Sequence, residues 1–206
     1  MTPEQEKVLE KIKANDQHPE RGEISFIRGY SGWSFVRRTP DWHERWNSNG
    51  RMQMCCNLKN WGKEGVCESW HENGQLKSRS NYKEGKLDGV WEEWYDSGQL
   101  QERSNWKNGK KNGLCESWYK DGQLEMRCNY KNGKHDGLFE RWHENSQLSG
   151  HCSFKEGKLD GLREIWNKDG RLEFRGMYKE DRLIKDLPLD DDTTRLTTKK
   201  KKGLKL

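Results

Sequence analysis

Short runs of aromatic and aliphatic residues recur along most of the chain, separated by polar turn sequences at a fixed spacing. Tryptophan returns every 24 residues without insertion, at Trp46, Trp70, Trp94, Trp118, Trp142 and Trp166. Half a period later a second motif recurs, for example YKEGKLDG from Tyr82. Self-similarity at a fixed period is typical of repeat proteins, whose units pack mainly against their neighbours. We therefore predict a linear array of about six 24-residue units.

Each unit contains two Gly-containing turn sequences, which predict β-hairpins with type I′ turns. A two-residue loop centred on Ser97 and Gly98 places Glu92 opposite Arg103, and the same centring pairs a Glu column with an Arg column throughout the repeats. A three-residue loop would instead oppose Glu92 and Glu102. Opposite charges across strands contribute roughly 0.2–1 kcal/mol each, so we predict the two-residue loop.

Strand alternation divides the side chains between two faces. One face is predicted to carry Leu100, Tyr95, Trp91, Trp106 and a small-residue column of Cys56, Ser80, Ser104, Cys128, Cys152 and Gly176. The other carries the Trp94 column, the Val90 column and the Glu–Arg pairs. Small residues leave room for large neighbouring rings, so we expect the first face to be the inner one. Both faces have apolar stripes, and the pattern leaves open which one is covered.

The ends of the chain lack the 24-residue period. Thr2 is placed to cap a helix that begins at Pro3, and EISFIR and WSFVRR predict a hairpin after it. We therefore divide the chain into residues 1–40, an N-terminal helix and capping hairpin; residues 41–184, the repeats; and residues 185–206, a flexible tail that is acidic and then basic.

Composition sets the broad class of protein. Hydrophobic residues are 30% and charged residues 35% of the chain, a balance that is typical of disordered proteins. The chain also has 11 Trp, 6 Tyr and 5 Phe, which are rare in disordered segments, so we expect aromatic rings to supply the buried apolar area. No run approaches the ~20 apolar residues of a membrane span, and the first residues lack the apolar segment of a signal peptide. We expect a protein that is not secreted and has no transmembrane segment.

The six Cys are expected to be free thiols. Cys128 and Cys152 occupy the same column two strands apart, roughly 9–10 Å, which exceeds the ~7 Å limit between Cα atoms for a disulfide. Cys67 and Cys115 share their column with Trp and Phe, which packing allows and metal ligation forbids. With no nucleophile–base motif and no phosphate loop either, we predict a non-enzymatic protein without metal or cofactor.

Aromatic residues of the repeats are the candidate partner-binding residues, because Trp and Tyr dominate interface hot spots. The candidates are Trp91, Tyr95, Tyr119, His143, Trp94 and Trp118. The invariant spacing of the tryptophan column favours a packing role, whereas variable columns favour a partner surface. A central Trp118 is expected to be better packed than the terminal Trp46, unless the N-terminal hairpin packs over the latter.

The C-terminal tail is the other candidate site. It carries seven Lys or Arg and four Asp, or +3 of the total charge of +5, so the remaining body is nearly neutral. A neutral body is a poor electrostatic footprint for nucleic acid. Attachment to nucleic acid or an anionic membrane would instead use Lys199, Lys200, Lys201 and Lys202; the alternative is a tail that only solvates.

The repeating unit, GxWxxWYxNGQLxxxxxYKNGKxDG, resembles the MORN-type repeat in the variant of bacterial antitoxin-like proteins and large DNA viruses. The resemblance spans residues 41–183, and Trp61, Ser146 and Asp181 depart from it by replacing turn glycines. It implies an all-β protein, an elongated twisted antiparallel meander of stacked β-hairpin repeats.

The same resemblance implies a function in protein–protein interaction. The expected protein is a scaffold, such as a viral structural or host-interaction protein; the alternatives are an antitoxin-like protein that neutralises a toxin, and a membrane or nucleic-acid adaptor acting through the tail. It implies the cytoplasm of a bacterium or an infected host cell, or the virion. Oligomers through sheet edges or faces stay open.

Overall fold

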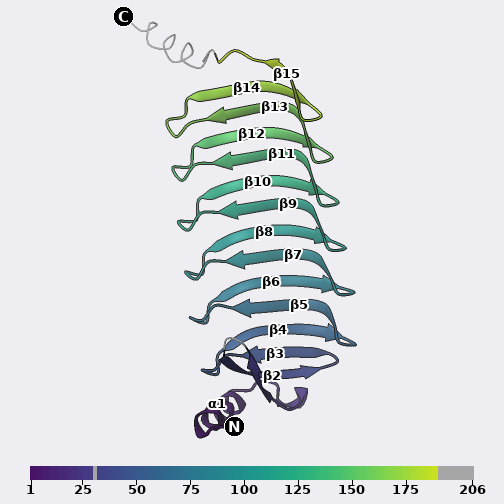
Figure 1. Ribbon diagram of the computed structural model, residues 1–206, viewed down its shortest axis with the longest axis vertical. Coiled ribbons are helices and arrows are strands. Elements are labelled where there is room, and N and C mark those ends of the chain that lie inside the picture. Colours follow the sequence, from purple (N-terminus) through teal and green to yellow (C-terminus); the bar gives the residue numbers. More distant parts are fainter. Residues whose placement is uncertain (30–31, 190–206) are drawn as a thin grey trace, which may run out of the picture.

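The computed structural model describes residues 1–29 and 32–189 of the 206-residue chain. A helix, α1 (Pro3–Ala14), and a 3-10 turn, η1 (Pro19–Arg21), precede one open antiparallel sheet of 15 strands. Every strand pairs with its neighbours in sequence, and the strands stack along the long axis of the molecule with α1 at one end (Figure 1). The all-β meander with one short N-terminal helix is confirmed.

The strand bounds follow the 24-residue period. The strands are β1 (Ser25–Gly29), β2 (Gly32–Thr39), β3 (Trp42–Trp46), β4 (Met52–Lys59), β5 (Gly62–Trp70), β6 (Leu76–Lys83), β7 (Lys86–Trp94), β8 (Leu100–Lys107), β9 (Lys110–Trp118), β10 (Leu124–Lys131), β11 (Lys134–Trp142), β12 (Leu148–Lys155), β13 (Lys158–Trp166), β14 (Leu172–Lys179) and β15 (Arg182–Asp186).

The hairpin loop that follows each tryptophan is one residue longer than predicted. The Tyr95 N–H donates to the Gln99 carbonyl at 2.8 Å, and the Gly98 N–H donates to the Tyr95 carbonyl at 2.9 Å, so the loop comprises residues 96–98. Gly98 has a φ of +86°. A left-handed residue after a type I turn is the usual ending of a three-residue hairpin loop. The predicted two-residue loop is therefore wrong.

A β-bulge nevertheless preserves the predicted charge register. Trp94 pairs with Leu100, the register shifts by one residue at Gln101, and Glu92 again lies opposite Arg103. Directly opposed residues point to the same side of a sheet. Leu100 therefore shares the face of Trp94, and its predicted place on the opposite face is wrong because the bulge was not foreseen.

The second hairpin loop of each unit has two residues, as predicted. Lys83 pairs with Lys86, and between them Glu84 and Gly85 have φ values of +51° and +75°. Positive φ at both central positions defines the type I′ turn, whose twist matches that of the flanking strands.

Replacing Ser146 with glycine should stabilise the protein by about 0.5–1 kcal/mol, since a left-handed residue costs roughly 1–2 kcal/mol and glycine loses part of that gain in backbone entropy. Ser146 has a φ of +62° at the loop position where Gly74 and Gly98 stand in other units. Urea unfolding measures the change. The matched control is Gly74→Ser, at a site with no neighbouring atom within 4 Å, which should lose a similar amount. Equal stability of all three proteins would contradict the strain argument.

The two faces differ in burial. We call the face with Trp46, Trp70, Trp94, Trp118, Trp142 and Trp166 the tryptophan face, and the opposite one the small-residue face. Ser104 and Cys128 of the small-residue face are fully buried, at 0% exposure, whereas Val90 of the tryptophan face is 38% exposed. The small-residue column is thus the buried one, as predicted.

One cysteine pair contradicts the expectation of six free thiols. Cys56 of β4 and Cys67 of β5 are directly opposed, with 4.1 Å between their Cα atoms, and form a disulfide. Cysteines of one column lie two strands apart, but Cys56 and Cys67 belong to different columns that meet across a single strand pair. Cys55, Cys115, Cys128 and Cys152 are free.

The N-terminal hairpin pairs as predicted, with Gly29 opposite Gly32. It adds β1 and β2 to the end of the sheet, while α1 packs on the tryptophan face. Ile12, Phe35 and Trp46 form a buried cluster there. Trp46 is only 6% exposed, whereas Trp118 is half-buried. Trp46 is thus better buried than Trp118, the exception expected where the N-terminal segment packs over it, and both α1 and Phe35 of the hairpin take part.

Candidate partner-binding surface

The N-terminal segment shows how the tryptophan face can be covered. Thr2 caps α1 through a reciprocal capping box with Gln5, and this cap fixes the start of the helix. The helix then lays one apolar stripe on the sheet: Val8, Leu9 and Ile12 pack on the cluster of Phe35 and Trp46.

The end of this segment supplies charges that match the face beneath it. Arg37 is 1% exposed; it donates to the His18 carbonyl at 2.7 Å, hydrogen-bonds Asp16, and lies 3.1 Å from a Glu44 carboxylate oxygen. Arg21 approaches the other Glu44 oxygen at 3.5 Å. Burial raises the pKa of Asp16, but hydrogen bonds from Arg37 and the His18 N–H outweigh it and hold that pKa below its ordinary value.

The later units repeat this face, and within residues 1–29 and 32–189 no helix lies over them. Glu68, Glu92 and Glu116 pair with Arg79, Arg103 and Arg127 at 2.7, 2.7 and 2.9 Å, and the three Arg side chains are 48–50% exposed. An apolar row runs beside them, in which Val66, Val90, Leu114 and Leu138 are 37–44% exposed. Each of these units thus contributes one partly exposed apolar residue to the row.

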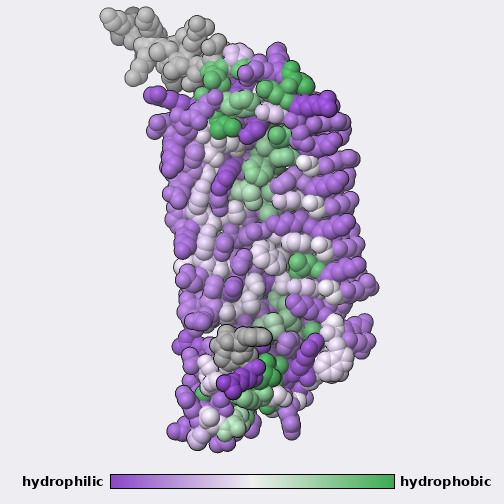
Figure 2. Space-filling view, in the orientation of Figure 1, coloured by the Kyte–Doolittle hydropathy of each residue, from purple (hydrophilic) through white to green (hydrophobic). Residues whose placement is uncertain are grey.

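Colouring by hydropathy shows how unevenly the molecule distributes its apolar residues. On the face in Figure 2 they gather along the middle of the sheet, between hydrophilic edges where the hairpins turn. Of the sequence candidates, Trp94 and Trp118 lie on the tryptophan face, where both are half-buried. Trp91 lies on the small-residue face, opposite Ser80 and Ser104. The six candidates therefore do not form one site.

Three further candidates hold neighbouring units together. The Tyr95 hydroxyl donates to the Trp118 carbonyl at 2.9 Å, the Tyr119 hydroxyl donates to the Trp142 carbonyl at 2.7 Å, and the His143 Nε2 bonds the Trp166 carbonyl at 3.0 Å. Burial raises the pKa of both tyrosines. Sequence reasoning missed this ladder, although a Tyr or His donor recurs after the tryptophan in four units.

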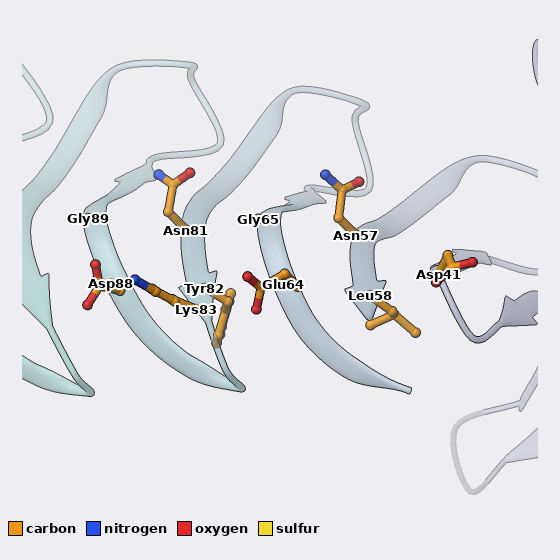
Figure 3. Close-up of a pocket in the computed structure, with 10 residues that line it drawn as sticks. All are labelled: Asp41, Asn57, Leu58, Glu64, Gly65, Asn81, Tyr82, Lys83, Asp88 and Gly89. Carbon is orange, nitrogen blue, oxygen red and sulfur yellow. The ribbon is translucent and has the colours of Figure 1, made fainter. Parts of the chain in front are cut away.

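A hollow of about 660 Å³ lies beside the first repeat units, lined by residues that include Asn57, Asn81 and Glu64 (Figure 3). Its polar side chains also make hydrogen bonds between neighbouring strands and units. Asn57 and Asn81 stand at equivalent positions beside Gly65 and Gly89 in Figure 3. The Asn81 amide donates to the Val90 carbonyl at 3.0 Å.

Acidic side chains that line this hollow accept hydrogen bonds from backbone N–H groups of the next turn. Glu64 accepts the Glu84 N–H at 2.7 Å, and Asp88 accepts the Asn108 N–H at 3.1 Å. These contacts tie one unit to the next. Within residues 1–29 and 32–189, no group of three or more His, Cys, Asp or Glu could hold a metal ion.

The fold defines a β-hairpin repeat protein built on one open antiparallel sheet. The MORN repeat variant family matches residues 63–84, 87–108 and 111–132. These consecutive units therefore belong to the MORN repeat variant family. MORN repeats are generally scaffolds for interaction with proteins or membranes and are typically non-enzymatic.

Other comparisons add little. Solved structures that match include a mutant of S. aureus TarM in complex with Fondaparinux, alpha-GlcNAc-glycerol and UDP, at 10% identity, and a second TarM structure at 12%. They cover 75% and 73% of this chain, which spans only about a quarter of theirs (26% and 27%), each with a TM-score of 0.26. So low a score carries no argument. No curated protein matches the chain.

The structure bears on membrane-spanning helices but not on the Lys-rich tail. Where the structure describes the chain, none of its helices is long and apolar enough to cross a membrane. Lys199, Lys200, Lys201 and Lys202 lie outside the described residues.

Proposed function

We propose that the protein is a non-enzymatic scaffold that binds an amphipathic helix of a partner protein on the tryptophan face, beyond the first unit. The observation that carries this proposal is the chain's own α1, which occupies the same face over Phe35 and Trp46. Later units present the same tryptophan column beside an exposed Val and Leu row. An amphipathic helix in an apolar groove is a recurrent mode of protein recognition.

The repeat spacing indicates what such a helix would look like. Equivalent residues of successive units are two strands apart, roughly 9.6 Å. A helix rises about 1.5 Å per residue, so one lying along the row would meet a new unit every six to seven residues. Acidic residues beside its apolar stripe would reach Arg79, Arg103 and Arg127, as Asp16 reaches Arg37 in the first unit.

The identity of the partner separates the narrower proposals. A virion or host protein would make this chain a viral structural or host-interaction protein, and a toxin would make it antitoxin-like. An adaptor role through Lys199–Lys202 would need binding to DNA or anionic vesicles that disappears when residues 185–206 are removed. We place the protein in the cytoplasm of a bacterium or infected cell, and association through sheet edges stays a further proposal.

The test compares surface variants of the full chain in affinity purification from the native source, with mass spectrometry. Val90→Lys combined with Leu114→Lys charges the apolar row at exposed positions. We expect at least a tenfold loss of the specific partner, because a hot spot contributes about 2 kcal/mol or more. The matched control, Lys107→Glu with Lys131→Glu, reverses the charge of the exposed last residues of β8 and β10 in the same units. Equal recovery with both variants would reject this face as the binding site.

A further inference from the structure

Two free cysteines face each other in the middle of the small-residue face. Cys115 of β9 and Cys128 of β10 are directly opposed, so their side chains point to the same side of the sheet. They are 1% and 0% exposed, and neither is bridged. They occupy the same two columns as Cys67 and Cys56, which form the disulfide between β4 and β5.

The backbone already holds this pair at a distance that a disulfide can span. Opposed residues of antiparallel strands have Cα atoms about 4.5–5.5 Å apart. Disulfides bridge Cα atoms about 4.4–6.8 Å apart. A bond between Cys115 and Cys128 would therefore require side-chain rotation and no displacement of β9 against β10.

The surroundings make the two thiols chemically unequal. The Lys111 ammonium lies 3.5 Å from the Cys115 sulfur and donates to a Glu102 carboxylate oxygen at 2.8 Å. The contact with the Cys128 thiol lowers the pKa of Cys115; burial opposes this, Lys111 adds to it, and the Glu102 carboxylate, which accepts from the Cys115 thiol at 3.6 Å, also opposes it. The same thiol contact and burial raise the pKa of Cys128. Cys115 is thus the more acidic of the two thiols and Cys128 the less acidic.

We propose that Cys115 and Cys128 form an oxidation site at which a small peroxide converts the dithiol into a reversible cross-strand disulfide. The Cys115 thiolate attacks one peroxide oxygen, the O–O bond breaks, and hydroxide leaves as Cys115 becomes a sulfenic acid. The hydroxide becomes water with the proton that Cys115 released on ionising.

The Cys128 sulfur then attacks the Cys115 sulfur. The S–S bond forms, the S–O bond breaks, and the departing hydroxide takes the Cys128 proton and leaves as water. Two thiols have lost two electrons and two protons, and hydrogen peroxide has become two waters. A thiol reductant such as dithiothreitol reverses the change by thiol–disulfide exchange.

The test treats the folded full chain with hydrogen peroxide, then denatures and alkylates it for peptide mass spectrometry. We expect a linked peptide pair joining Cys115 to Cys128, 2 Da lighter than the two free peptides, while Cys152 stays alkylated. Dithiothreitol should restore both thiols. Oxidation of Cys115 and Cys128 no faster than Cys152, or no link between them, would overturn the proposal.

Variants of Lys111 and Cys128, with Lys110→Met as the control, separate the chemistry from any effect on folding. Lys111→Met should slow formation of the link at least several-fold, whereas Lys110→Met, at the neighbouring first residue of β9, should not. Cys128→Ser should trap the sulfenic acid at Cys115, detected as a dimedone adduct. An unchanged rate in Lys111→Met, in protein whose circular dichroism matches the wild type, would refute the role of the ammonium and with it the site.

Discussion

Replacing Trp46 with alanine is expected to destabilise the protein by about 3–5 kcal/mol, the usual effect of truncating a buried aromatic side chain. Trp46 is 6% exposed, in a cluster with Ile12 and Phe35. The same change at Trp118 removes a ring that is only half-buried and should cost visibly less. Urea unfolding of the two variants beside the wild type gives the comparison directly.

The control for Trp46 is Ile12→Ala, which trims the helix side of the same contact. If α1 is what buries Trp46, the two losses should not add, because side chains in contact share one interaction. A larger loss at Trp118 than at Trp46 would show that the repeats bury their tryptophans without help from the helix.

Replacing Arg37 with leucine should cost about 3–5 kcal/mol, because removing one partner of a buried ion pair leaves uncompensated charge. The Arg37 side chain is 1% exposed, and those of Asp16 and Glu44 are 10% and 6% exposed. Arg127→Leu is the matched control: its side chain is 48% exposed, and exposed pairs contribute only ~0–1 kcal/mol.

A double variant and a pH series separate charge from packing. Arg37→Leu with Asp16→Asn should recover part of the loss, since the orphaned carboxylate is gone. Folding lowers the pKa of Asp16 from 3.8, so its contribution is present above about pH 4 and is lost as the pH falls through the folded-state value. The acid-side loss of stability should be smaller in Arg37→Leu. An identical pH profile would show that Arg37 acts through packing alone.

The repeat itself could be predicted from the sequence, because columns of like residues report strand register directly. The Glu92–Arg103 pairing was right even though the loop was not. A two-residue loop without a bulge and a three-residue loop with a bulge place those charges opposite each other equally well. The two loop lengths differ only in which face of the sheet Leu100 occupies. Both faces accept a leucine, so the sequence does not distinguish the two loops.

The N-terminal cover could not be placed in the same way. Val8, Leu9 and Ile12 predict an apolar helix stripe, but a helix outside the period has no column that tells which face it meets. The placement depends instead on Arg37 and Asp16, which form an ion pair when the segment folds back onto β2. The sequence therefore predicts the row of apolar residues on the candidate partner face. It does not predict that α1 covers the first part of that face.

The hydrogen bonds that join successive units have a consequence for how such a chain can change its length. Each loop donor, such as Tyr95 or His143, bonds a carbonyl 23 residues onward, and that carbonyl belongs to the next tryptophan. Duplicating or deleting 24 residues anywhere in the array reproduces every donor with its acceptor. The length of the sheet can thus change by whole 24-residue units through unequal crossing-over. No new contact between units has to evolve.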